Sequence, residues 1–319
     1  MDQNDLLLSI VVPMFNEEDG VDVFFETVEA VLSRMDVDYE IVCVNDGSRD
    51  GTLRCLLRHR ERNPRIRVVD LSRNFGKDLA LTAGLDRSLG DVVVPIDADL
   101  QDPPELIPAM LEKWREGYDV VYAVRRSREE DSRFKRFSAG GFYRLFNALS
   151  FWEIPFNTGD FRLMSRQVVD SLRQFPENNR FMKGLFSWVG FRQTGIEYVR
   201  VARAKGETKW NYWKLWNFAL DGITAFSTIP LRLWSYVGAL VSMLAFLYGT
   251  FLILLTLIFG RDVPGYTSIM VVILFLGGVQ LLSIGVLGEY IGRIYIETKG
   301  RPIYIIRREY GLEDETGES

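Results

Sequence analysis

Short apolar, β-branched runs alternate with amphipathic stretches over about the first 200 residues. The apolar runs predict strands, and the stretches between them, in which apolar residues recur at helical spacing, predict helices. The expected strands are Ser9–Pro13, Glu40–Asn45, Ile66–Asp70, Val92–Ile96 and Val120–Val124, and the expected helices are Gly20–Met35, Thr52–Arg62, Lys77–Leu89 and Pro104–Glu116. This alternation predicts an α/β domain with a mostly parallel sheet and helices on both faces.

Two long uncharged stretches follow. Leu233–Phe259 contains 27 residues without a charge and Thr267–Gly288 contains 22, whereas about 20 residues suffice to cross a bilayer. Only a short polar turn at 260–266 separates them, so we expect a transmembrane helical hairpin. The alternative, two buried helices of a soluble core, is disfavoured by their length and lack of charge.

Basic residues gather on the two outer flanks of this hairpin rather than in its turn. They are Lys209, Lys214 and Arg232 before it and Arg293, Lys299, Arg301, Arg307 and Arg308 after it. The positive-inside rule therefore places both termini on the cytoplasmic face. The predicted organisation is an α/β domain over 1–208, amphipathic juxtamembrane helices over 209–231, the two membrane helices within 232–292, and a cytoplasmic tail over 293–319.

Charge and the rare residue types narrow the chemistry. The formal net charge is −5, which gives no general basic field for binding nucleic acid. Cys43 and Cys55 form no paired motif, so a disulfide scaffold or a cysteine zinc site is excluded. The single histidine, His59, lies in a polar run that predicts a solvated helix surface. Proton transfer and metal binding are thereby left to carboxylates, which suit Mg²⁺ or Mn²⁺.

Polar clusters follow several predicted strands, where ligands of open α/β sheets bind. Asp97-Ala98-Asp99 comes directly after Val92–Ile96, and its two carboxylates project to the same side, as a cation bound to a diphosphate requires. A second such pair, Asp36-Val37-Asp38, lies in a polar turn, so position after a strand is what distinguishes the first. Asp46 follows the second strand, where a capped turn is the alternative explanation.

Together with four further segments these residues resemble the family 2 glycosyltransferases of the GT-A fold, in which an Asp-x-Asp motif holds a metal on the diphosphate of a nucleotide sugar. The segments are Arg73-Asn74-Phe75-Gly76-Lys77, Leu100-Gln101-Asp102-Pro103-Pro104, Asn157-Thr158-Gly159-Asp160-Phe161-Arg162 and Gly206-Glu207-Thr208-Lys209. They narrow the resemblance to polyisoprenyl-phosphate glycosyltransferases, similar to dolichol-phosphate mannose synthase. The ending Leu287–Arg293 with Lys299–Pro302 is similar to the bacterial subgroup with two C-terminal membrane helices.

The resemblance implies a role for each matching residue. It places Pro13, Asn16, Glu17 and Asp46 in the nucleoside pocket, Lys77 near it, Asp97 and Asp99 on the metal, and Gln101 with Asp97 at the diphosphate and donor sugar. Asp160 takes the position of the catalytic carboxylate. A phosphate monoester has a second pKa of about 6 and is mostly dianionic at neutral pH. Asp160 is therefore either a base or a group that orients the reactants.

The lipid phosphate of such a reaction needs cations. Arg126 and Arg133 lie in a basic cluster after the fifth predicted strand, and Lys209 lies just before the membrane segment. We expect these three to bind the phosphate, with contact to anionic headgroups as the alternative.

The sequence thus predicts transfer of a hexose, with UDP-glucose as the preferred donor, to a polyprenyl phosphate on the cytoplasmic membrane face by an inverting single displacement. GDP-mannose or a modified UDP-sugar is the alternative donor. A processive polysaccharide synthase is a weaker alternative because its Gln-x-x-Arg-Trp motif is absent. A non-catalytic membrane subunit that senses nucleotide sugar is a third. Gly288 and Gly292 would permit close packing between copies in a homo-oligomer or within the hairpin itself.

Overall fold

The computed structural model describes residues 6–126, 158–178, 180, 182–198, 229–259 and 265–311. Eight strands form one mixed sheet in the order β7-β5-β6-β4-β1-β2-β3-β8. Their bounds are β1 (Leu7–Met14), β2 (Asp38–Asn45), β3 (Ile66–Leu71), β4 (Val92–Pro95), β5 (Val120–Arg125), β6 (Thr158–Ser165), β7 (Gln193–Tyr198) and β8 (Ile306–Tyr310). The first five confirm the strands expected from the apolar runs.

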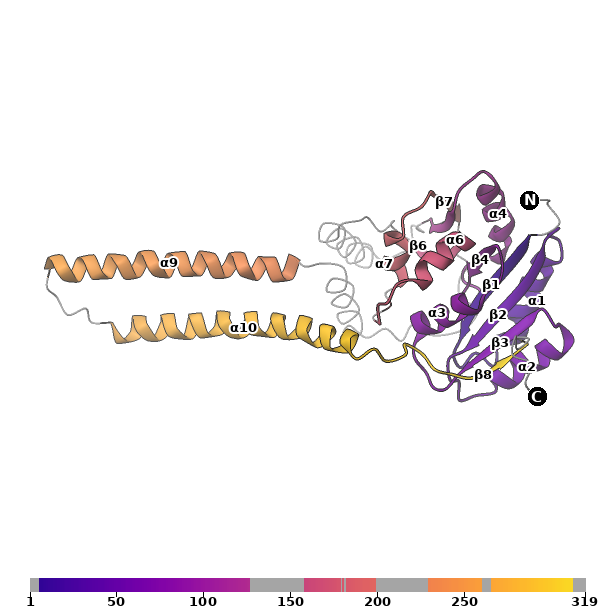
Figure 1. The fold of residues 1–319 in the computed structure, drawn as a ribbon, viewed down its shortest axis with the longest axis horizontal. Coiled ribbons are helices and arrows are strands. Elements are labelled where there is room, and N and C mark those ends of the chain that lie inside the picture. The colour runs from indigo at the N-terminus through magenta and orange to yellow at the C-terminus, as the bar shows by residue number, and fades with distance from the viewer. Residues whose placement is uncertain are drawn as a thin grey trace.

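Helices cover both faces of this sheet. They are α1 (Val21–Leu32), α2 (Thr52–Arg62), α3 (Lys77–Arg87), the short 3₁₀ turn η1 (Pro104–Leu106) continued by α4 (Ile107–Arg115), α6 (Arg166–Arg173) and α7 (Met182–Trp188). Residues of α1, α2 and α4 share one buried cluster, and residues of α3, α6 and α7 share a second. The sheet therefore lies between two helical layers (Figure 1).

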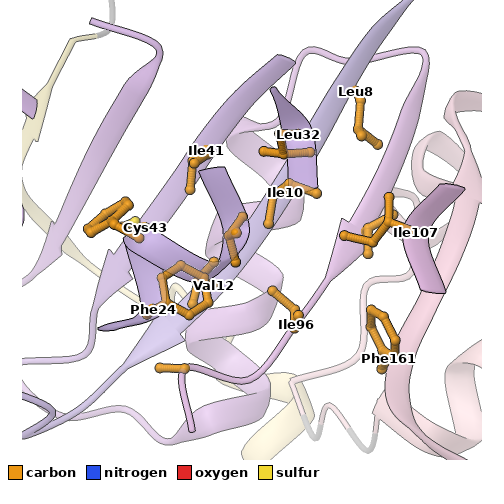
Figure 2. Close-up of a cluster of buried hydrophobic side chains, with 14 of the residues drawn as sticks. Leu8, Ile10, Val12, Phe24, Leu32, Ile41, Cys43, Ile96, Ile107 and Phe161 are labelled. Atoms are coloured by element: carbon orange, nitrogen blue, oxygen red, sulfur yellow. The ribbon is translucent and has the colours of Figure 1, made fainter. Parts of the chain in front are cut away.

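Strand β1 shows how the sequence pattern builds both layers. Leu8, Ile10 and Val12 are fully buried in the first cluster, whereas Val11 points into the second. Alternate side chains of a strand point to opposite faces, so a continuous apolar run gives a central strand buried on both sides. Figure 2 shows Ile10 and Val12 in one cluster with Phe24 and Leu32 of α1.

The chain order along the sheet reverses next to β1. β1 pairs in parallel with β2 on one side and with β4 on the other, and β2 continues in parallel to β3. The connections after β1 and β4 consequently lead away in opposite directions along the sheet, to β2 and towards β5, and such a reversal is where open α/β sheets form a ligand crevice. β6 then runs antiparallel between β4 and β5.

A pair of long apolar helices, described below, lies in the chain between β7 and β8 of this sheet. After it, β8 returns to pair antiparallel with β3, with Val69 opposite Glu309 and Asp70 opposite Arg308 (Figure 1). Within the segment 293–319, which the sequence analysis described as a tail, Ile306–Tyr310 thus form an edge strand of the sheet. Arg307 and Arg308 belong to this edge strand rather than to a flank of the membrane helices.

Two long helices, α9 (Ile229–Phe259) and α10 (Tyr266–Thr298), lie side by side and extend away from the sheet domain (Figure 1). Both contain stretches long and apolar enough to cross a membrane, Tyr236–Leu255 and Ile269–Thr298, and the described side chains of these stretches are not buried. The two helices confirm the predicted helical pair, although α10 continues past 288.

The glycines of α10 are not used in its contact with α9. A Cβ built at Gly277, Gly285, Gly288 or Gly292 would meet no atom within 4 Å. Close packing within the hairpin therefore does not explain these glycines in the described part of the chain.

His59 differs from the sequence expectation. Its ring stacks on Phe25 with centroids 4.4 Å apart, its Nε2 lies 2.6 Å from Asp22 Oδ1, and its side chain is only 14% exposed. The polar run around it hid this packing, because one ring face is covered by α1 while the neighbouring side chains point to solvent.

Candidate active site

A cavity of about 420 Å³ lies at the carboxyl ends of β1, β2 and β4. Six of the residues that the sequence analysis assigned to the donor site line it: Pro13, Glu17, Asp46, Lys77, Asp97 and Asp99. The strand order reverses between β1 and β4, so the connections that follow these two strands lead away in opposite directions and leave room for this crevice.

Asp97 and Asp160 meet although 63 positions separate them in the sequence. In the antiparallel β4–β6 pair, Val92 lies opposite Ser165 and Val93 opposite Met164. Continuing this register past the end of β4 places Asp97 opposite Asp160. Strand pairing, rather than any local motif, therefore builds the acidic centre.

Lys77 bridges these two carboxylates. Its Nζ lies 2.7 Å from Asp97 Oδ1, 2.9 Å from Asp97 Oδ2 and 2.7 Å from Asp160 Oδ2. Lys77 is the first residue of α3, where the helix macrodipole disfavours a cation. The two carboxylates therefore hold the ammonium in this position.

The pKa values of Asp97 and Asp160 are shifted in opposite directions. Burial raises the pKa of Asp97 and outweighs the effect of Lys77. Burial also acts to raise the pKa of Asp160, but Lys77 and Lys183 together hold that pKa below its usual range. The pKa of Lys77 is raised, because Asp160 and Asp97 outweigh the cost of burying its charge. Asp160 and Lys77 are thus charged at neutral pH.

Asp46 fixes the loop that precedes Lys77. Its two carboxylate oxygens accept hydrogen bonds from the backbone N–H of Phe75 at 2.7 Å and of Gly76 at 3.0 Å. Burial raises the pKa of Asp46, and these two donors oppose that shift. Asp46 lines the cavity and also holds its wall, and the backbone groups that it caps belong to the loop before Lys77 rather than to its own turn after β2.

Asn16 lies at the exposed rim of the same region with a positive φ of 54°. Its N–H donates to Ser48 Oγ at 3.0 Å, and its Oδ1 accepts from the N–H of Arg49 at 2.9 Å. The residue joins the turns after β1 and β2, and it is not among the residues that line the cavity.

The turn after Asp99 is built around Leu100, whose φ is 52°. Asp99 Oδ1 accepts from the N–H of Gln101 at 3.2 Å. Gln101 is 4% exposed, and its Nε2 is buried without a hydrogen-bond partner in the described structure. A strained turn and an unpaired buried donor beside a cavity are typical of a ligand site.

Sequence reasoning missed several charged and polar groups of this region. Asp78 and Lys183 act electrostatically on Asp160, and Arg162 stacks on Phe186 with its guanidinium carbon 4.0 Å from the ring centroid. Tyr198 donates a short hydrogen bond to the buried Asp102. Of these, Asp78 and Arg162 carried a signal, because Asp78 directly follows Lys77 and Arg162 lies in the same segment as Asp160.

Of the three residues expected to bind the acceptor phosphate, the structure describes one, Arg126. Arg126 is exposed at the end of β5, where its N–H donates to the carbonyl of Tyr198 at 2.9 Å. Arg133 and Lys209 lie outside the described residues, as does the expected amphipathic region up to residue 228.

The acidic centre suits a divalent cation that shares its ligands with a substrate. Within the described ranges, no three His, Cys, Asp or Glu side chains form a complete metal site. Asp97 and Asp99 line one cavity, and a lysine ammonium already lies against Asp97. Mg²⁺ and Mn²⁺ at phosphate sites take one or two carboxylates and draw other ligands from phosphate and water. The residues present fit that coordination.

Comparison with known proteins agrees with these observations. Residues 9–173 match the family model of glycosyl transferase family 2, and residues 229–294 match the GtrB C-terminal hairpin. The chain is 56% identical over 306 residues to an uncharacterized glycosyltransferase of Synechocystis sp., covering 96% of each chain. It is 53% identical over 301 residues to a prophage bactoprenol glucosyl transferase homolog of Escherichia coli K12, covering 94% of this chain and 98% of that one.

The bactoprenol glucosyl transferase of Shigella phage SfV is also 53% identical, over 302 residues that cover 95% of this chain and 98% of that one. Among solved structures, glucosyl-3-phosphoglycerate synthase from Mycobacterium tuberculosis, in complex with Mn²⁺ and UDP-glucose, is 20% identical with a TM-score of 0.45. That alignment covers 69% of this chain and 77% of that chain.

Proposed function

The chain belongs to glycosyl transferase family 2, and from that premise we propose that it transfers glucose from UDP-glucose to a polyprenyl phosphate. Membership confirms the resemblance and the GT-A fold class expected from the motifs. The choice of glucose and of a polyprenyl acceptor is supported by the relatives named bactoprenol glucosyl transferase, which align over nearly the whole chain.

The observation that carries this proposal is the acidic centre at the end of the cavity. Asp97 and Asp160 come from different strands and share one lysine, and Asp99 lines the same cavity. We assign the nucleoside to the part of the cavity lined by Pro13, Glu17 and Asp46, with Asn16 at its rim. The diphosphate then lies beside Asp97, and Gln101 faces the donor sugar.

Mg²⁺ or Mn²⁺ held by Asp97 and Asp99 would neutralise charge on the departing diphosphate. The chain's own residues supply the rest of the centre. Lys77, whose ammonium lies between Asp97 and Asp160, is placed to pair with the diphosphate. The buried position of Asp160 excludes water from the carboxylate that faces the reacting carbon.

The acceptor phosphate oxygen attacks the anomeric carbon as the bond from that carbon to the diphosphate oxygen breaks, which inverts the anomeric configuration. A phosphate monoester with a second pKa of about 6 already carries the required charge at neutral pH. We therefore assign Asp160 the task of orienting the acceptor and the sugar rather than of removing a proton. Its lowered pKa keeps it anionic for this task.

The membrane hairpin places this centre beside a substrate confined to the bilayer, which raises the effective concentration of the acceptor. In this proposal α9 and α10 span the membrane, and both termini and the sheet domain lie in the cytoplasm. Arg126, with Arg133 and Lys209, would bind the lipid phosphate. Assembly of this chain into a homo-oligomer remains a prediction from its sequence.

The test is transfer of radiolabelled sugar into the lipid phase. Full-length protein in detergent is incubated with polyprenyl phosphate, Mg²⁺ or Mn²⁺, and UDP-glucose, with GDP-mannose and UDP-N-acetylglucosamine as parallel donors. Label in the lipid phase with UDP-glucose alone supports the proposal. Binding of nucleotide sugar without any lipid product would instead favour the sensing subunit.

A further inference from the structure

Lys77 occupies the place where the acidic centre receives a cation. Its ammonium contacts both oxygens of Asp97 and one oxygen of Asp160. We propose that Lys77 is an internal counter-ion that competes with the divalent metal for Asp97, so that the metal binds tightly only together with the nucleotide sugar. This inference rests on the proposed function.

The backbone fixes where Lys77 can reach. Asp46 holds the two N–H groups immediately before Lys77, those of Phe75 and Gly76, and Gly76 adopts a φ of 100°. Lys77 then begins α3. Because the preceding turn is held by a buried carboxylate, the lysine side chain starts from a fixed point and its ammonium lies between the two acids.

Charge explains why the lysine and the metal exclude each other. Asp97 faces Lys77, Asp160 and Asp99, so it lies among like charges that one ammonium partly offsets. A metal ion that takes Asp97 as a ligand would lie beside this ammonium, and two cations at such a distance repel each other strongly in a partly buried site. The metal must therefore displace Lys77 from Asp97.

The nucleotide-sugar donor supplies the negative charge that the displaced Lys77 ammonium needs as a partner. A diphosphate brings two or more negative charges into the cavity, which can pair with the released ammonium and complete the coordination of the metal. Asp160 remains beside Lys77 as its second partner. A divalent metal and a diphosphate with two negative charges enter together, so the net charge of the centre is the same with and without donor, and Lys77 acts as a positioning residue for the diphosphate.

Metal binding without any acceptor lipid tests this inference. Mn²⁺ is titrated into full-length protein and followed by the electron paramagnetic resonance signal of free Mn²⁺, first without and then with UDP. We expect Lys77→Met to bind Mn²⁺ at least about tenfold more tightly than wild type without UDP. With UDP the difference should shrink, because the diphosphate then draws Lys77 away.

Three further variants make the comparison specific. Lys77→Arg keeps the charge and should retain weak Mn²⁺ binding without UDP. Lys113→Met removes an exposed lysine of α4 that pairs with Glu116 and does not line the cavity, and it should match wild type. Asp97→Asn removes the ligand and should weaken binding in every condition. Melting curves identify any variant that fails to fold, and Lys77→Gln replaces Lys77→Met in that case.

Equal or weaker Mn²⁺ binding by Lys77→Met and Lys77→Gln without UDP would overturn the inference. This measurement is independent of the proposed glucose transfer, because Mn²⁺ binding is followed with and without UDP and no lipid product has to form. A wild-type protein that makes no lipid-linked sugar but shows the expected shift would contradict the proposed function alone.

Discussion

The backbone N–H of Ser72 donates a hydrogen bond to the carbonyl oxygen of Ile305 at 2.9 Å. Ser72 begins the loop that continues through Asn74 and Gly76 into the wall of the cavity. Ile305 belongs to the segment that follows the membrane helices. Arg307 adds a bond of 2.7 Å to the carbonyl of Ser72. The segment after α10 thus holds the loop that forms a wall of the cavity.

Removing this segment should weaken both the fold and the donor site. A chain ended after Pro302 loses the β3–β8 pairing and the ion pair of 2.7 Å between Arg87 and Glu309. We expect a lower melting temperature and an affinity for UDP-glucose reduced by roughly tenfold, because the loop must then be ordered on binding. Differential scanning fluorimetry and isothermal titration calorimetry measure the two quantities.

A chain ended after Gly311 is the matched control, because it keeps β8 complete. It should melt and bind as the full chain does. If both truncated chains bind UDP-glucose like the full-length protein, β8 has no part in ordering the loop.

Asp78 should make stability depend on pH. Burial, with Asp160 as the next cause, raises its pKa from 3.8 to about 6. A carboxyl with a raised pKa binds its proton more tightly in the folded than in the unfolded chain, so its charge costs stability above about pH 6 and not below about pH 4. Asp78→Asn should therefore stabilise the protein by about 1–3 kcal/mol at pH 8.

The gain should vanish as the pH falls towards 4, which chemical denaturation at several pH values measures. Asp170→Asn on α6, whose acid is 49% exposed, controls for the loss of one negative charge. A gain from Asp78→Asn that is equal at pH 4 and pH 8 would show that the buried charge is not its origin.

Tyr198 should stabilise the turn that carries Gln101. Its hydroxyl donates to Asp102 and accepts from Arg125 Nε at 2.9 Å, while Arg125 itself is 3.4 Å from Asp102. Asp102 is 2% exposed. Tyr198→Phe leaves this buried carboxylate with one long contact and should cost about 1–3 kcal/mol of unfolding free energy. An unchanged denaturation midpoint would mean that water replaces the hydroxyl.

The strands that the sequence predicted and those it missed differ in a physical way. β1 to β5 are apolar runs bounded by turns, and this pattern is local. β6 contains Asp160 and Arg162, and β7 is mostly half-exposed, so neither shows an apolar run. β8 is a charged edge strand whose partner, β3, lies more than 200 positions earlier. Only the pairing across the sheet reveals these three.

The sequence predicted many of the residues that line the cavity, but not which of them contact one another. Asp97 and Asp46 follow buried strands, and that position alone indicates a ligand site. That Lys77 lies between Asp97 and Asp160 depends on the β4–β6 register and on the turn held by Asp46. No spacing within the sequence contains that information. Arg133 and Lys209 remain predictions of the sequence alone.

The central claim is that the acidic centre transfers glucose to a lipid phosphate. The most direct measurement compares lipid-phase label from UDP-glucose for wild type, Asp160→Asn, Asp97→Asn and the surface control Asp170→Asn. We expect label with wild type and with Asp170→Asn, and a loss of at least about a hundredfold with the other two. Full transfer by Asp160→Asn and Asp97→Asn, or no lipid product from wild type, would contradict the account.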